Sequence, residues 1–174
     1  AKPTSIISQT APSPVNQTED SKLGVFANAG NESSQTFTLE NNLVKATFNS
    51  QGGYPETVIL KEFTTWEKNE LILFNKNKLA IRIPAKGLNI TNQDLVFEKL
   101  PASNATTLAL QAKGSDGSAV ELNWTLKPDS YTLDLQTKFN LQPELKDLSQ
   151  KNLHVEWSQS APGKEKNRSN ESDN

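Results

Sequence analysis

Residues 119–141 read AVELNWTLKPDSYTLDLQTKFNL, and apolar and polar side chains alternate through most of this run. Successive side chains of a strand point to opposite faces, so a period of two predicts strands with one buried and one solvated face. Pro128 and Asp129 separate the two halves of the run and suit a tight turn, because proline fixes φ and aspartate favours turns. The stretch therefore predicts an antiparallel hairpin.

The same alternation extends outward from this hairpin. Residues 37–39 and 44–48 alternate in the same way and flank Asn41-Asn42, which predicts a second hairpin. About ten short strands with turn signals between them, and helix expected only within residues 141–150, indicate an all-β fold. We expect an antiparallel β-sandwich, because strands with one polar face do not suit a parallel α/β core. The expected core includes Phe37, Leu39, Phe48, Leu60, Leu73, Leu122, Trp124, Leu133, Leu135 and Trp157.

Composition divides the chain into three parts. Residues 1–34 are rich in Ser, Thr, Asn, Gln and Pro, which predicts a flexible tether, interrupted by an island at 23–27 that could form an edge strand. Residues 35–160 are expected to form the β-sandwich domain, and residues 161–174 a disordered polar tail. The chain contains no methionine, so we expect it to be a processed or excised segment.

Charge and residue usage exclude several classes of function. The formal net charge of the 174 residues is −2 with both signs dispersed, which gives no basic stripe for nucleic acid. The absence of cysteine excludes disulfides and thiolate metal sites. No apolar run approaches the roughly 20 residues that a membrane-spanning helix requires. The sequence predicts no cofactor and no metal site.

Few residues suggest chemistry. His154 is the only histidine and is expected on the solvated face of a strand, so we predict no catalytic residue. Gly52 and Gly53 are not followed by a helix, and they are interpreted as a structural turn in which at least one glycine has positive φ. Trp66 lies in a polar connection and is the candidate for a contact with a partner protein.

Several motifs in the N-terminal half occur in an order that resembles a known family. These are Gly24-Val25-Phe26-Ala27, the run from Phe37 to Lys45, Asn49-Ser50-Gln51-Gly52-Gly53, Val58 to Phe63, and Leu71-Ile72-Leu73-Phe74. In this order they resemble the periplasmic domain of the YidC family of membrane protein insertases, in its Bacteroidetes form. The chain departs from the family pattern at Val25, where proline is common, and at Tyr54-Pro55, where a basic-apolar pair is usual.

The resemblance implies a supersandwich-like domain at the periplasmic face of the bacterial inner membrane. It implies that the segment itself is soluble and is tethered to the membrane in the full-length protein. The sandwich is expected to be incomplete at its C-terminus, because the family's domain is longer. Implied partners are components of the Sec translocon and nascent membrane proteins, with a non-catalytic scaffold or docking role. The alternatives are a carbohydrate-binding or mutarotase-like supersandwich and a surface adhesin.

Overall fold

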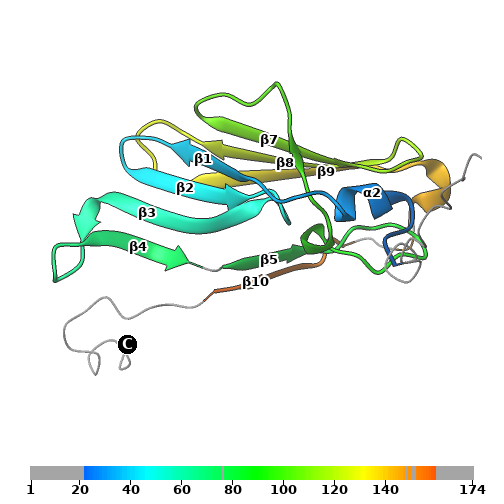
Figure 1. Ribbon diagram of the computed structural model, residues 1–174, viewed down its shortest axis with the longest axis horizontal. Helices are drawn as coiled ribbons and strands as arrows, with labels where there is room; N and C mark the ends of the chain where they lie inside the picture. The colour runs from blue at the N-terminus through cyan, green and yellow to red at the C-terminus, as the bar shows by residue number, and fades with distance from the viewer. Residues whose placement is uncertain (1–21, 76, 148, 150–151, 160–174) are drawn as a thin grey trace, which may run out of the picture.

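The computed structural model describes residues 22–75, 77–147, 149 and 152–159, and its strands form two four-stranded sheets and a two-stranded ribbon (Figure 1). The first sheet has the order β1-β2-β3-β4, with bounds Thr36–Glu40, Val44–Asn49, Tyr54–Thr64 and Glu70–Asn75. The second has the order β6-β7-β8-β9, with bounds Glu98–Lys99, Thr107–Lys113, Ala119–Leu126 and Leu133–Asn140. The ribbon pairs β5 (Lys78–Ile81) with β10 (Val155–Ser158). Each of these pairs is antiparallel.

The two four-stranded sheets pack face to face around one apolar core. The rings of Phe48 on β2 and Trp124 on β8 lie with centroids 5.4 Å apart. The indole Nε1 of Trp124 also donates a hydrogen bond of 2.7 Å to the backbone oxygen of Gly53, which satisfies its buried N–H. The predicted fold class, an all-β antiparallel sandwich, is confirmed.

The hairpin predicted at residues 119–141 is present as β8 and β9. Trp124 pairs with Leu135 and Val120 with Phe139, as the alternating pattern requires. Asp129 occupies the turn with a φ of 52°, a conformation that a short polar side chain tolerates. Tyr131 lies in the connection, because β9 begins only at Leu133.

The second predicted hairpin, β1 and β2, is also present, and its turn contacts the turn of the first. The side-chain oxygen of Asn41 accepts hydrogen bonds from the backbone N–H groups of Leu43 and Val44, at 2.9 and 2.7 Å. Its amide nitrogen donates to the backbone oxygens of Lys127 and Ser130, at 2.7 and 2.8 Å. Asn41 therefore joins the two sheets at the ends of their hairpins.

Eight of the ten predicted core residues contribute to the core. Leu39, Phe48, Leu122 and Trp124 are buried, and the half-buried members pack against them. The half-buried members are Phe37, Leu60, Leu133 and Leu135.

Leu73 was predicted in the core and is instead 49% exposed. The pairing of β3 with β4 shifts between Val58 and Ile59, which pair with Phe74 and Ile72. Leu73 is thus the extra residue of a β-bulge, and a bulge redirects the side chain away from the regular alternation. Phe74 takes the buried position beside it.

Trp157 was also predicted in the core and is 61% exposed. The strand that carries it, β10, pairs with β5 in the separate ribbon and is exposed at all four positions. The ring of Trp157 packs edge-on against Phe74, with centroids 6.2 Å apart. In the described part of the chain, no second layer covers its other face.

Residues 22–34 were expected to belong to a flexible tether, but part of this segment is folded against the sheets. The island predicted as an edge strand forms a 3-10 helix, η1 (Gly24–Phe26), followed by α2 (Ala27–Gly30). Leu23, Phe26 and Ala29 recur at the helical interval of three residues and are buried, so packed structure begins before residue 35. Of the helix expected within 141–150, the described residues 141–147 and 149 contain the 3-10 turn η3 (Pro143–Leu145). The proposed tether before residue 22 and the polar tail at 161–174 lie outside the described residues.

Candidate functional site

An apolar groove of about 390 Å³ lies between the two sheets, next to the ribbon. Its buried floor is formed by side chains of β2, β3, β4, β5 and β8. These are Val44, Val58, Phe74, Leu79 and Trp124. Its exposed rim is formed by Leu73, Tyr131, Val155 and Trp157. Leu73 and Trp157, which were wrongly predicted to be in the core, therefore both lie at the rim of this groove.

The groove offers few polar groups. Its buried Asn77 donates a hydrogen bond of 3.0 Å to the backbone oxygen of Pro55, and its side-chain oxygen accepts one from Nε1 of Trp157. Tyr131 is the one titratable residue among those that line it. Partial desolvation raises the pKa of Tyr131, and so does Glu62, whose carboxylate accepts a hydrogen bond of 2.9 Å from its hydroxyl. Such a surface suits an apolar occupant.

One wall of the groove ends in an edge strand. β9 is eight residues long and, in the described part of the chain, pairs only with β8. Leu133 and Leu135 point toward the groove and are half-buried. An edge strand leaves a row of backbone N–H and C=O groups that another strand can pair with.

Gly52 and Gly53 lie in a buried turn between β2 and β3. Their φ angles of 80° and 63° confirm the prediction of positive φ. Asn92 donates a hydrogen bond of 2.6 Å to the oxygen of Gly52, and Trp124 donates to that of Gly53. Both glycine carbonyls are therefore used inside the fold, which supports the structural interpretation of this turn.

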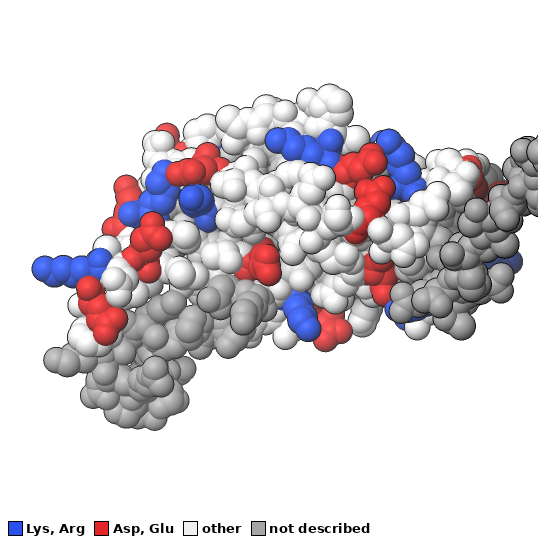
Figure 2. All heavy atoms as spheres, viewed as in Figure 1, with Lys and Arg blue, Asp and Glu red and all other residues white. Residues whose placement is uncertain are grey.

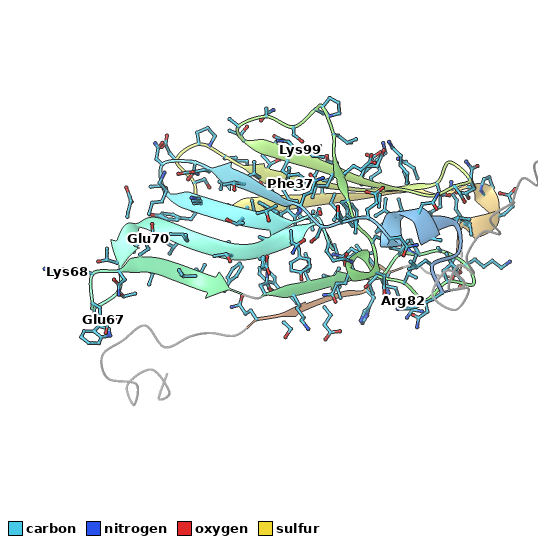
Figure 3. All side chains as sticks on the ribbon, viewed as in Figure 1. Phe37, Glu67, Lys68, Glu70, Arg82 and Lys99 are labelled. Carbon is cyan, nitrogen blue, oxygen red and sulfur yellow. The ribbon has the colours of Figure 1, made fainter. Side chains whose placement is uncertain are left out.

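Trp66 lies in the turn of the β3–β4 hairpin and is 57% exposed. The turn is closed by backbone hydrogen bonds from Thr65 to Asn69 and from Lys68 to Thr65, at 2.9 and 2.8 Å. Figure 3 shows Glu67 and Lys68 in this turn, beyond the end of the sheet, and Glu70 at the start of β4. The position suits a contact with another protein, and that role stays a prediction.

The described residues contain no cluster of side chains suited to holding a metal ion. Within residues 22–75, 77–147, 149 and 152–159, no group of three His, Asp or Glu side chains could hold a metal ion. His154 is exposed immediately before β10, where its backbone oxygen accepts a hydrogen bond of 3.0 Å from the backbone N–H of Arg82. Basic and acidic side chains are interspersed on the face shown in Figure 2, without a patch of one sign.

Comparison with known proteins finds several curated relatives that share the name membrane protein insertase YidC. No family model matches the chain. The chain is 28% identical over 142 residues to the membrane protein insertase YidC of Phocaeicola vulgatus, which covers 80% of the chain and 22% of the relative. It is 29% identical over 161 residues to the YidC of Azobacteroides pseudotrichonymphae, which covers 89% of the chain and 26% of the relative. The YidC of Chlorobaculum tepidum is 28% identical over 130 residues.

The chain resembles the YidC membrane protein insertases. This confirms the resemblance inferred from the motifs between Gly24 and Phe74. The chain spans about a quarter of the length of the curated YidC relatives it matches. Their matches extend over 66–89% of the chain, well beyond the motifs.

Sequence reasoning did not find the groove of this YidC-like chain. Leu73 and Trp157 were recognised as apolar strand residues, but the bulge and the pairing of β5 with β10 depend on long-range register. The role of Asn77 in the groove could not be predicted from the sequence, because Asn is a usual residue in turns. Among the described residues, no helix is long and apolar enough to cross a membrane.

Proposed function

We propose that the chain is a non-catalytic docking domain of a membrane protein insertase. The observation that carries the proposal is the similarity, over 80–89% of the chain, to proteins named as membrane protein insertases. The geometry agrees with a binding role, because the groove and the β3–β4 hairpin expose apolar side chains to solvent.

The proposal places the domain on the periplasmic side of the inner membrane, joined to the membrane part of the parent protein. In that setting it holds components of the Sec translocon or nascent membrane proteins near the site of insertion. The charge distribution supports a protein partner more than nucleic acid, since Lys and Arg (18 in all) are balanced by Asp and Glu (20). Trp66 is the proposed contact, because exposed tryptophan is enriched at the centres of interfaces.

The carbohydrate alternative receives less support. Sugar recognition needs several polar groups that converge on the ligand, and the groove presents one buried amide that already bonds to Pro55 and Trp157. His154 is the only histidine and stands outside the groove lining.

The test places a photo-crosslinking amino acid at Trp66 in the parent protein within intact cells. Lys99, exposed on β6, provides the matched control position. We expect Trp66 to yield adducts with a membrane-protein biogenesis component or a nascent membrane protein, and Lys99 to yield none. Adducts absent at Trp66, or equal at both positions, would contradict the docking role of this hairpin.

A further inference from the structure

Three exposed aromatic side chains gather where the β3–β4 hairpin turns, and we call them the aromatic end. They are Phe63, Trp66 and Tyr131, which are 49%, 57% and 47% exposed. The rings of Phe63 on β3 and Tyr131, in the β8–β9 connection, lie with centroids 6.2 Å apart, so the aromatic end joins the two sheets. Phe63 and Trp66 are not among the residues that line the groove. Clustered exposure of large apolar rings marks a surface that binds a partner.

The aromatic end is exposed because β3 is longer than its neighbour β2. Their pairing ends at Val44 and Leu60, and the backbone N–H of Lys61 donates a hydrogen bond of 2.7 Å to the backbone oxygen of Leu43. The following part of β3, residues 61–64, is exposed at every position. The β3–β4 hairpin therefore extends past the turn of the β1–β2 hairpin (Figure 1). A partner can reach its rings without any change in the fold.

The charged groups beside these rings are mainly carboxylates. Residues 62–70 contain three glutamates and a single lysine. Lys61, which comes just before them, is paired with the carboxylate of Glu40 at 2.8 Å. The carboxylate of Glu62 accepts a hydrogen bond of 2.9 Å from the hydroxyl of Tyr131, which holds it beside the rings. The aromatic end thus combines ring faces with an excess of negative charge, and both attract a cation.

We propose that the aromatic end binds an extended segment of a partner protein that carries arginine side chains. A guanidinium group stacks on an aromatic ring and pairs with a carboxylate at the same time, for which its planar, forked shape is better suited than a lysine ammonium. Phe63 and Trp66 supply the rings, and Glu62 and Glu67 supply the carboxylates. The inference rests on the docking function proposed above and names the chemistry of the partner.

Other occupants fit this surface less well. The excess of carboxylates in residues 62–70 would repel an anionic lipid surface or a nucleic acid. An apolar segment without basic groups would cover Glu62 and leave its charge without a cation, which is unfavourable. An arginine-bearing segment covers the rings and neutralises the carboxylates together.

The test places a photo-crosslinking amino acid at Thr64 of the parent protein in intact cells. Thr64 is exposed at the end of β3, so the crosslinker leaves the three rings in place. The yield of protein adducts is measured with Glu62→Lys and Glu67→Lys combined, and with Glu144→Lys, an exposed carboxylate on η3, as the matched control. Immunoblots confirm equal amounts of each variant. We expect the two reversals to lower the yield at least about tenfold, because like charges then face each other, and the control to leave it unchanged.

A second pair of variants tests the rings. Phe63→Leu keeps most of the apolar bulk but removes the ring face, whereas Phe63→Tyr keeps both. We expect the adduct yield at Thr64 to fall by about threefold or more for Phe63→Leu and to persist for Phe63→Tyr. Mass spectrometry of the adducts should place the crosslinked residue of the partner within a few positions of an arginine.

The outcomes separate this inference from the docking function. Adducts that persist through the charge reversals or through Phe63→Leu would overturn the arginine-bearing partner and leave the docking function standing. Adducts at Trp66 but none at Thr64, or adducts with lipid or with a second copy of the protein, would also overturn it. The absence of adducts at both positions would overturn the two proposals together.

Discussion

Gly53 has a φ of 63° and lies where β2 turns into β3, against the second sheet. A Cβ built there would stand 2.8 Å from Leu122 and 3.2 Å from Phe97. Gly87 has a similar φ of 78° but no atom within 4 Å of such a Cβ. A substitution at Gly87 therefore measures backbone strain alone, and the same substitution at Gly53 measures backbone strain together with overpacking.

We expect Gly87→Ala to lower the free energy of unfolding by about 1–2 kcal/mol, the cost of left-handed backbone. Gly53→Ala should cost a further ~1–3 kcal/mol, because Leu122 and Phe97 must shift. Urea unfolding of the two variants measures the difference. Equal losses would contradict the tight packing of the Gly53 turn.

Asp94 closes the turn η2 (Asn92–Asp94) through a capping box with Thr91. Burial disfavours ionisation of its carboxyl, but hydrogen bonds from Lys22 and Thr91 outweigh burial and hold the pKa of Asp94 below its usual value. A lowered folded-state pKa contributes stability above the unfolded-state pKa of about 4, and this contribution is lost as pH falls through the folded-state value.

Asp94→Asn keeps an oxygen that can accept the hydrogen bonds from Thr91 but removes the charge that pairs with Lys22, so it should lower stability by about 0.5 kcal/mol at pH 7, as exposed ion pairs do. The deficit should shrink as pH falls below about 4, where the carboxyl of the unfolded chain takes up a proton, and should vanish below the lower folded-state pKa. The measurement is the urea midpoint of both proteins from pH 7 to pH 3. A deficit that stays constant over this range would show that ionisation of Asp94 does not contribute.

The β1–β2 and β8–β9 hairpins are joined at their turns by Asn41, whose side chain makes four hydrogen bonds. Asn104 makes comparable local bonds, to the N–H groups of Thr106 and Thr107, but none to the other sheet. Asn41→Ala should lower the free energy of unfolding by about 2 kcal/mol and Asn104→Ala by about 1 kcal/mol or less. Thermal and urea unfolding compare them; an equal cost would mean that the link between the turns adds no stability.

The bulge in β4 places Leu73 in the groove and Phe74 in the core, although the two are neighbours in the sequence. In the 174-residue chain, Phe74→Ala should cost about 3–5 kcal/mol, because it leaves a cavity in the core. Leu73→Ala should cost about 0.5 kcal/mol or less, as exposed substitutions do. Chemical denaturation of both variants is the check. A larger loss for Leu73→Ala would place the bulge one residue away.

At the scale of the whole molecule, some features of the fold are determined by the sequence within a few residues and others by pairing between distant segments. Alternation around Leu122 and Trp124 and the turn at Asn41-Asn42 predicted the hairpins, because both signals act within a few residues. The positive φ of Gly52 and Gly53 followed from a chain reversal next to Pro55. The groove was not predictable, because Leu73 faces it through a bulge and Trp157 through pairing with a strand 78 residues earlier, at Leu79. The island at 23–27 was predicted as an edge strand and is helical, because a run of five residues is too short to show a helical spacing of its apolar side chains.

We propose that this domain binds partner proteins and takes no part in the insertion step itself. The most direct test replaces residues 22–159 of the parent protein with a flexible Gly/Ser linker. The purified parent, with and without the replacement, is reconstituted into liposomes, and the insertion of a membrane protein is measured in the absence of other components. We expect the two insertion rates to agree within experimental error, since the domain serves partners that this assay leaves out. Loss of insertion in the purified system would contradict the account and place the domain within the insertion machinery.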